Sequence, residues 1–256
     1  MLDKIIEISK ETGSMIKEDF GTNFSIEFKT NASNIVTEVD KKAEKKIMDF
    51  IRKNYPGHSI IAEESGEHKS DSDYQWVVDP IDGTTNFAHG LPIFSVSIGV
   101  RKNEEIIYGV VYDIMRDVVY SAEKGSGAFY NGKKLKASPE SNLAESLLVT
   151  GFPYDIKTNP HKSIEKFNAF LLNSRAVRRL GSAAIDLCYV AQGIFEGFWE
   201  VHLQPWDMCA GILLVEEAGG KVTNFNDEPI NIFSKQILAT NGKVHNDMLD
   251  ILNMNS

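Results

Sequence analysis

Two aspartates in the segment WVVDPIDGTTN, residues 76–86, are the side chains best placed to do chemistry. A strand of buried character delivers Asp79 and, three residues later, Asp82 into a turn made by Pro80 and Gly83. Two like charges that converge at a strand end are costly unless something neutralises them, and divalent cations that prefer oxygen ligands are the simplest remedy. An ordinary capped turn is the alternative, because Asp-Gly pairs are common turn formers. The combination of residue types in this segment favours the metal site.

Other acidic residues could join these two aspartates. Glu63 and Glu64, in IIAEESGE, follow a four-residue apolar strand and therefore lie where a strand leaves the core. Asp207 follows Pro205 and Trp206 at the expected N-terminus of an apolar helix. Taken alone, the glutamates fit an exposed acidic turn and Asp207 fits a helix cap.

The first 57 residues are expected to be mostly helical. Apolar residues recur with helical spacing from Leu2 to Phe20, and Gly21 is a plausible stop. A polar loop and a helix start are expected from Lys29 to Asp40, before a second amphipathic helix that Pro56 and Gly57 close.

The hydrophobic period then changes to that of strands. Short runs rich in β-branched and aromatic residues occupy residues 59–62, 76–79, 94–100, 106–113 and 118–123. Only a few polar residues separate the last three runs, so an antiparallel meander is the most economical arrangement. After Pro139 strand-like and helix-like segments alternate, which is typical of an α/β half. We therefore expect an N-terminal α+β domain at residues 1–136, with most of the candidate ligands, and a C-terminal α/β domain at residues 137–256.

Composition limits the classes of partner. The 256 residues include 27 Lys and Arg against 36 Asp and Glu, a formal charge of 27 − 36 = −9. This balance argues against a general nucleic-acid or anionic-membrane binder, because such surfaces are held mainly by surplus Lys and Arg. Two cysteines cannot form a disulfide framework, and the N-terminus has no basic start followed by an apolar run. We expect a cytoplasmic protein.

Five segments together resemble the inositol monophosphatase family of magnesium-dependent, lithium-sensitive sugar phosphatases. They lie in the family's order and cover essentially the whole chain: VTEVD (36–40), EES (63–65), WVVDPIDGTTNF (76–87), GSAAIDLCYVAQG (181–193) and WDMCAGILLVEEAGG (206–220). The resemblance implies a layered αβαβα sandwich, a homodimer, two to three Mg²⁺ ions in each active site and hydrolysis of a small phosphate ester.

The resemblance also implies a role for each matching residue. Glu63, Asp79 and the carbonyl of Ile81 would hold one magnesium ion, and Asp79, Asp82 and Asp207 would hold a second. A third, weaker ion near Glu63 would carry the attacking water. Thr84 and Asp40 would orient that water and accept its proton. Such a site needs no nucleophilic Ser or Cys, because phosphoryl transfer depends mainly on positioning and charge stabilisation.

The implied substrate contacts lie in both halves of the chain. Backbone amides of Gly83 and Thr84 would hold the phosphate, and Gly181, Ser182, Ala183 and Glu200 would face the alcohol. Ser182 stands where family members often have Thr. Lys29 matches a mobile family loop that closes over the metals. Arg178 and Arg179 could bind a second anionic group, although paired arginines at a strand end are more often surface ion-pair residues.

Three alternatives stay open at this stage. GAFYNGKK, residues 127–134, meets part of a P-loop pattern, but Lys134 stands where Ser or Thr should bind magnesium, and Asn131-Gly132 is a hairpin signal. Among substrates, inositol monophosphate is the first choice because Glu200 matches a residue that contacts a ring hydroxyl; relatives act on fructose-1,6-bisphosphate, the 2′-phosphate of NADP or 3′-phosphoadenosine phosphates. A regulatory protein that docks to a partner on the same fold is the third.

Overall fold

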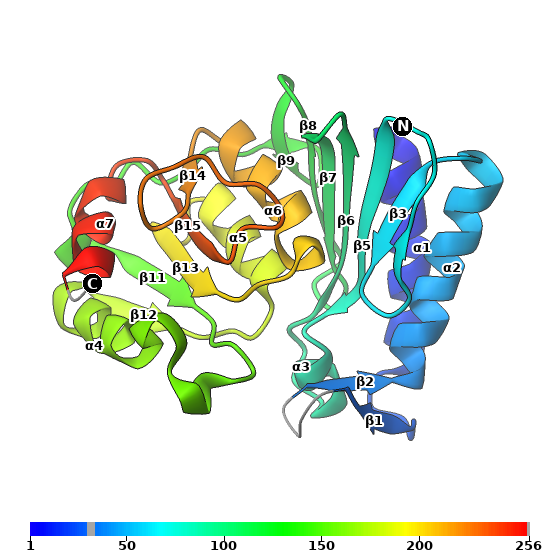
Figure 1. The fold of residues 1–256 in the computed structure, drawn as a ribbon, viewed down its shortest axis with the longest axis horizontal. Helices are drawn as coiled ribbons and strands as arrows, with labels where there is room; N and C mark the ends of the chain where they lie inside the picture. The colour runs from blue at the N-terminus through cyan, green and yellow to red at the C-terminus, as the bar shows by residue number, and fades with distance from the viewer. Residues whose placement is uncertain (30–33, 255–256) are drawn as a thin grey trace.

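Helices and sheets alternate in five layers in the computed structural model, which describes residues 1–29 and 34–254. Figure 1 shows the order from right to left: two N-terminal helices, a large sheet, two central helices, a smaller sheet and two outer helices. This arrangement confirms the layered α+β sandwich expected from the sequence.

The N-terminal helices form the first layer. Helix α1 (Leu2–Asp19) ends one residue before the predicted end, and α2 spans Glu38–Asn54. Thr37 caps α2: its hydroxyl accepts from the Asp40 amide while the Asp40 carboxylate accepts from the Thr37 amide. Both helices pack their apolar faces on the large sheet, in a core that includes Ile5, Ile47 and Trp76.

The large sheet has eight strands in the order β10-β9-β8-β7-β6-β5-β3-β4. The bounds are β3 Ser59–Ala62, β4 Gly66–His68, β5 Tyr74–Asp82, β6 Ser95–Lys102, β7 Glu105–Asp113, β8 Val118–Glu123, β9 Gly127–Tyr130 and β10 Lys133–Lys134. Strands β6, β7 and β8 pair antiparallel in sequence, which confirms the predicted meander. The register of β5 against β6 shifts between Asp79 and Asp82, so a bulge lies at the candidate ligands.

The GAFYNGKK segment is a β-hairpin. Strands β9 and β10 pair antiparallel, and Asn131 and Gly132 both have positive φ in the turn between them. Residues 135–142, which follow the hairpin, form no helix, so the hairpin signal was right and the partial P-loop match has no structural support.

The second half of the chain supplies the other three layers. The smaller sheet has the order β12-β11-β13-β15-β14, with β11 Leu147–Thr150, β12 Ala176–Arg178, β13 Gly197–Val201, β14 Lys221–Thr223 and β15 Gln236–Thr240. Helices α5 (Ala183–Ala191) and α6 (Pro205–Glu217) are packed between the two sheets, and α4 (Ser163–Asn173) and α7 (His245–Asn253) cover the outer face. The boundary near Lys136 stays a prediction.

Four strands of three residues each were not predicted. The segment expected as a loop before Asp40 contains β2 (Ile35–Thr37), which pairs with β1 (Ile26–Phe28), and the strands β4 and β14 are also only three residues long. Such strands carry too few residues to display an alternating pattern, and cross-strand pairing rather than propensity fixes them. Within the described residues, no helix combines the length and apolar character needed to cross a membrane.

Candidate metal and phosphate site

Three aspartates from two distant segments of the chain meet between the large sheet and α6. Asp79 and Asp82 come from the end of β5, and Asp207 comes from the first turn of α6. One carboxylate oxygen from each lies within 4.8 Å of the others. Three oxygen ligands at this separation fit a divalent cation, and the sequence predicted all three.

Asp207 is a helix cap as well as a member of this cluster. Its carboxylate accepts a hydrogen bond of 2.7 Å from the backbone amide of Gln204, the residue that caps α6. One carboxylate oxygen can therefore hold the helix terminus while the group still faces the other aspartates. The two interpretations of this residue are compatible.

Burial makes the charged form of the cluster unfavourable. It raises the pKa of Asp79 and of Asp207 well above the ordinary value, and nearby carboxylates, including Glu63 and Asp82, raise both further. Burial also raises the pKa of Asp82 to about 6, against the opposing effect of its hydrogen bonds. A bound cation would remove this repulsion, so the donor set fits the metal that the resemblance implies.

Asp82 is held in place by the N-terminus of α5. Its Oδ2 accepts a 3.0 Å hydrogen bond from the Ala184 amide and another from the Ser182 hydroxyl. The same hydroxyl caps the helix by accepting from the Ile185 amide. Ser182 is thus engaged with a candidate ligand, and it lines the adjoining cavity together with Gly181 and Ala183.

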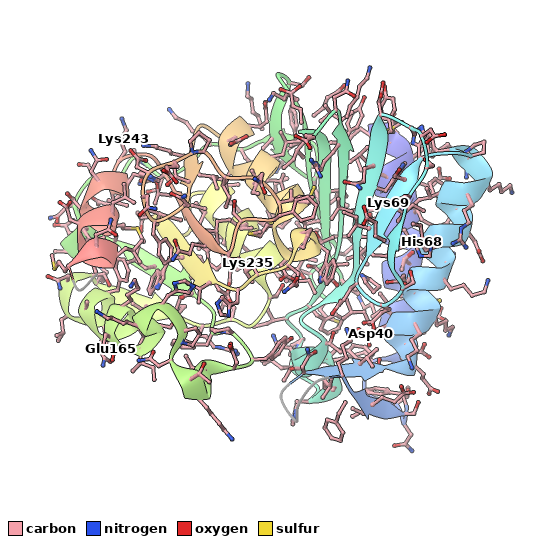
Figure 2. The ribbon with its side chains drawn as sticks, viewed as in Figure 1. Asp40, His68, Lys69, Glu165, Lys235 and Lys243 are labelled. Carbon is pink, nitrogen blue, oxygen red and sulfur yellow. The ribbon has the colours of Figure 1, made fainter. Side chains whose placement is uncertain are left out.

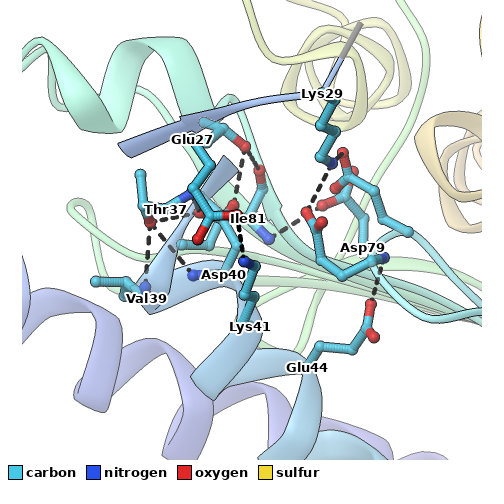
Figure 3. A network of polar contacts seen from close by, with 12 residues as sticks. Glu27, Lys29, Thr37, Val39, Asp40, Lys41, Glu44, Asp79 and Ile81 are labelled. Atoms are coloured by element: carbon cyan, nitrogen blue, oxygen red, sulfur yellow. Dashed lines mark hydrogen bonds and ion pairs between the residues drawn. The ribbon is translucent and has the colours of Figure 1, made fainter. Parts of the chain in front are cut away.

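Glu63 and Glu64 lie in the turn after β3, and one lysine bridges them. Lys29 Nζ is 2.7 Å from Glu63 Oε1 and 2.7 Å from Glu64 Oε1 (Figure 3). Burial lowers the pKa of Lys29, but the two carboxylates outweigh that effect and the pKa is raised. The amide of Glu64 donates to Glu44 on α2, which fixes the turn from the other side. The ammonium therefore sits where Glu63 was predicted to hold a cation.

Asp40 and Thr84 are in direct contact at the N-terminus of α2; Figure 2 labels Asp40. Thr84 Oγ1 lies 2.9 Å from Asp40 Oδ1 and 3.0 Å from the carbonyl oxygen of Ile81. Asp40 is fully buried, and burial raises its pKa to about 6 although hydrogen bonds from Thr37 oppose the rise. The predicted pair is therefore assembled, with a carboxylate basic enough to take a proton near neutral pH.

A cavity of about 970 Å³ opens beside these groups. Its wall includes every predicted substrate contact, among them Gly83, Gly181 and Glu200. Gly83 has a φ of 102°, and a Cβ there would lie 3.0 Å from the Ile93 carbonyl, so glycine is required at this turn. Polar and apolar groups share the wall, as expected for a small polar ligand.

The two arginines separate in the structure. Arg179 lines this cavity, whereas Arg178 lines a second, more open hollow beside β12. Sequence reasoning also missed Asp186 and Tyr154, which line the main cavity. Asp186 had a signal that could have found it, because it is the single charged residue in the apolar run SAAIDLCYVA.

Comparisons with known proteins agree on one family. The family model described as the inositol monophosphatase family matches residues 1–253. The Nus factor SuhB of Salmonella typhimurium is 44% identical over 97% of this chain and 94% of its own length, and the inositol-1-monophosphatase of Synechocystis is 40% identical over 96% and 88%. A crystal structure of SuhB from Bartonella henselae has a TM-score of 0.95 at 35% identity, over 99% of this chain and 98% of that one. The chain belongs to the inositol monophosphatase family and, with it, to the phosphatases.

Proposed function

We propose that this protein is a magnesium-dependent phosphomonoesterase that hydrolyses inositol monophosphate, or a related small phosphate ester, by direct attack of water. The observation that carries the proposal is the convergence of Asp79, Asp82 and Asp207 within 4.8 Å, beside the contact between Thr84 and Asp40. Family membership supports the same reaction class.

The acidic residues would hold the metal. Asp79 would be shared between two ions, with Glu63 and the Ile81 carbonyl on one side and Asp82 and Asp207 on the other. When bound, the ions supply positive charge that polarises the phosphate and makes a nearby water a better nucleophile. Lys29 occupies one oxygen of Glu63, so a cation bound there would compete with the ammonium for the charge of that carboxylate.

The neighbouring residues would handle the proton and the substrate. Thr84 has one hydroxyl proton, which it can give to Asp40 or to the Ile81 carbonyl, so its oxygen can accept a hydrogen bond from the attacking water. Asp40 would take the proton in turn. The backbone amides of Gly83 and Thr84 would bind the phosphate, while Gly181, Ser182, Ala183 and Glu200 would face the alcohol.

Phosphate release by the purified protein tests the proposal. The substrates would be inositol 1-phosphate, fructose-1,6-bisphosphate, NADP and 3′-phosphoadenosine 5′-phosphate, each with magnesium, with EDTA and with added lithium. We expect magnesium-dependent, lithium-sensitive release, fastest from inositol 1-phosphate. Brisk release in EDTA would contradict the metal requirement. A preference for NADP or a bisphosphate would identify a different substrate without contradicting the metal-dependent hydrolysis.

A second candidate function comes from a relative's name. The Salmonella typhimurium relative is called a Nus factor rather than a phosphatase, which favours a regulatory docking role on this fold.

We also propose that the protein is a homodimer, as the resemblance implies. Light scattering of the purified protein measures its molar mass in solution. A monomeric mass would contradict the homodimer proposal without affecting the proposed reaction.

A further inference from the structure

One carboxylate on the cavity wall has no part in the proposed chemistry. Asp186 is only 1% exposed, lies in the first turn of α5 and lines the same cavity as Asp82 and Ser182. Its Oδ1 has no hydrogen-bond partner among the described residues. A buried carboxylate oxygen without a donor is unfavourable, so such a group calls for an explanation.

Helix capping does not provide that explanation. Ser182 already caps α5, because its hydroxyl accepts from the Ile185 amide and its carbonyl accepts from the Asp186 amide. The neighbours Ile185 and Leu187 are fully buried apolar residues, and an apolar side chain at position 186 would suit the same environment. The charge at this position is therefore not required by the helix.

A second carboxylate lies on the same wall. Glu200, at 8% exposure, comes from β13, and its carboxylate occupies the space above Gly151, where a Cβ would lie 2.3 Å from both of its oxygens. A side chain at residue 151 would push Glu200 out of its present position. The backbone thus makes room for this acid on the cavity wall.

The two acids share one electrostatic environment. Burial raises the pKa of Glu200 to about 8 and that of Asp186 well above its usual range. Glu200 raises the pKa of Asp186 further, while Arg179, which is exposed on the same cavity, lowers the pKa of both. The charge of Arg179 therefore acts on both buried acids, but Asp186 Oδ1 still lacks a donor, which a ligand in the cavity can supply.

We propose that Asp186 is a specificity-determining residue that, together with Glu200, accepts hydrogen bonds from hydroxyls on the alcohol part of the substrate. This inference rests on the proposed phosphatase function. Asp186 and Glu200 would favour polyol phosphates with adjacent free hydroxyls, because one hydroxyl brings a donor to Asp186 Oδ1, which lacks one, and a neighbouring hydroxyl can reach Glu200. A second phosphate group is disfavoured at this wall, since two carboxylates oppose one arginine.

The test compares two substrates in two variants of the full-length protein. Inositol 1-phosphate carries the hydroxyls, and p-nitrophenyl phosphate has none. We expect Asp186→Asn to lower kcat/KM for inositol 1-phosphate about tenfold, mostly through KM, because the amide replaces one acceptor oxygen by an NH2 group that cannot accept from a hydroxyl. Its kcat/KM for p-nitrophenyl phosphate should change less than about twofold, since that substrate never makes the bond.

Asp113→Asn is the matched control. Asp113 is also 1% exposed and accepts a hydrogen bond from the Arg116 amide, but it does not line the cavity. This variant should leave the ratio of the two kcat/KM values unchanged. An equal loss on both substrates in Asp186→Asn would overturn the proposal and make Asp186 a structural residue.

A binding measurement separates this proposal from the proposed function. If the unaltered protein releases no phosphate from either substrate, the phosphatase proposal fails, and calorimetry of inositol 1-phosphate binding in calcium then decides the role of Asp186. Binding about tenfold weaker in Asp186→Asn than in Asp113→Asn would support it. Equal binding by the two variants, or no binding by the unaltered protein, would overturn it.

Discussion

Asp82 is the residue on which most of the candidate site depends. It lies within 4.8 Å of two other candidate ligands and also accepts hydrogen bonds from Ser182 and Ala184. Substitution by Asn keeps the size and can still accept those bonds, while it removes the charge that a cation needs.

We expect Asp82→Asn to reduce phosphate release at least about 100-fold, because metal ions contribute several kcal/mol to phosphoryl transfer. The circular-dichroism spectrum and the melting curve should show an intact fold. Asp113→Asn, at another buried acid, away from the cavity, should keep its activity. If a strain carrying Asp82→Asn shows unchanged cellular function, the docking role is favoured over the enzymatic one.

The titration of the buried acids gives a second prediction at this scale. Burial raises the folded-state pKa of Asp40 and Asp82 to about 6 and that of Glu200 to about 8, above ordinary values of 3.8 and 4.5. The folded state therefore binds more protons than the unfolded state between about pH 4 and pH 8. Stability must fall as pH rises through this window.

In EDTA, we expect the melting temperature to be higher at pH 5.5 than at pH 8, by on the order of 5 °C. Magnesium should reduce this difference, because a bound cation favours the charged carboxylates. Calorimetric melts across the pH range, with and without magnesium, measure both effects. A melting temperature that rises with pH in EDTA would contradict the raised pKa values of these buried acids.

At the scale of elements, the bridge from Lys29 joins the end of β1 to the turn after β3. The three side chains are 9–21% exposed, so this ion pair is neither fully buried nor fully solvated. It holds two acidic residues together in the absence of metal. The bridge and a cation at Glu63 would compete for the same carboxylate.

We expect Lys29→Met to lower the free energy of unfolding in EDTA by about 1–2 kcal/mol, between the values for exposed and buried pairs. The loss should be smaller with magnesium present, since the cation takes over the charge of the lysine. Lys41→Met removes an exposed bridge to Glu27 and serves as control, with little change in either condition. Equal losses with and without magnesium would contradict competition at Glu63.

At the scale of the whole molecule, close packing of α6 on the large sheet sets the position of Asp207. Gly99 and Gly109 lie on neighbouring strands beneath this helix, and a Cβ at Gly109 would be 2.7 Å from the carbonyl oxygen of Ala210. The obstacle is backbone, so a side chain can be accommodated only if the helix moves.

We expect Gly109→Ala to destabilise the protein by about 1–3 kcal/mol, the usual cost of overpacking, and to lower phosphate release as well. The activity should fall because a shift of α6 displaces Asp207 from Asp79 and Asp82. Denaturant melts and the same phosphate assay measure the two effects. Glu105→Ala, at an exposed position on the same strand, is the control and should change the free energy of unfolding by less than about 0.5 kcal/mol. If Gly109→Ala is destabilised but fully active, the packing of α6 at Gly109 does not set the position of Asp207.

Local sequence patterns predicted much of the fold. The runs SIIA and VVYSAE match β3 and β8 residue for residue, and Asn131-Gly132 marks a real hairpin, because strand alternation and turn chemistry are local properties. The three-residue strands β1, β2, β4 and β14 escaped prediction, because so short a run shows no alternation and cross-strand pairing stabilises it.

The sequence determined the position of some candidate ligands, and tertiary packing determined the position of the others. The sequence by itself determined that Asp79 and Asp82 share one strand end, because three residues of chain cannot separate them widely. Only the tertiary structure decided that Asp207 joins them, that Lys29 bridges the two glutamates, and that Asp186 and Arg179 face the cavity while Arg178 does not. These placements depend on how α5 and α6 pack between two sheets, and that packing is the sum of many contacts between residues distant in sequence.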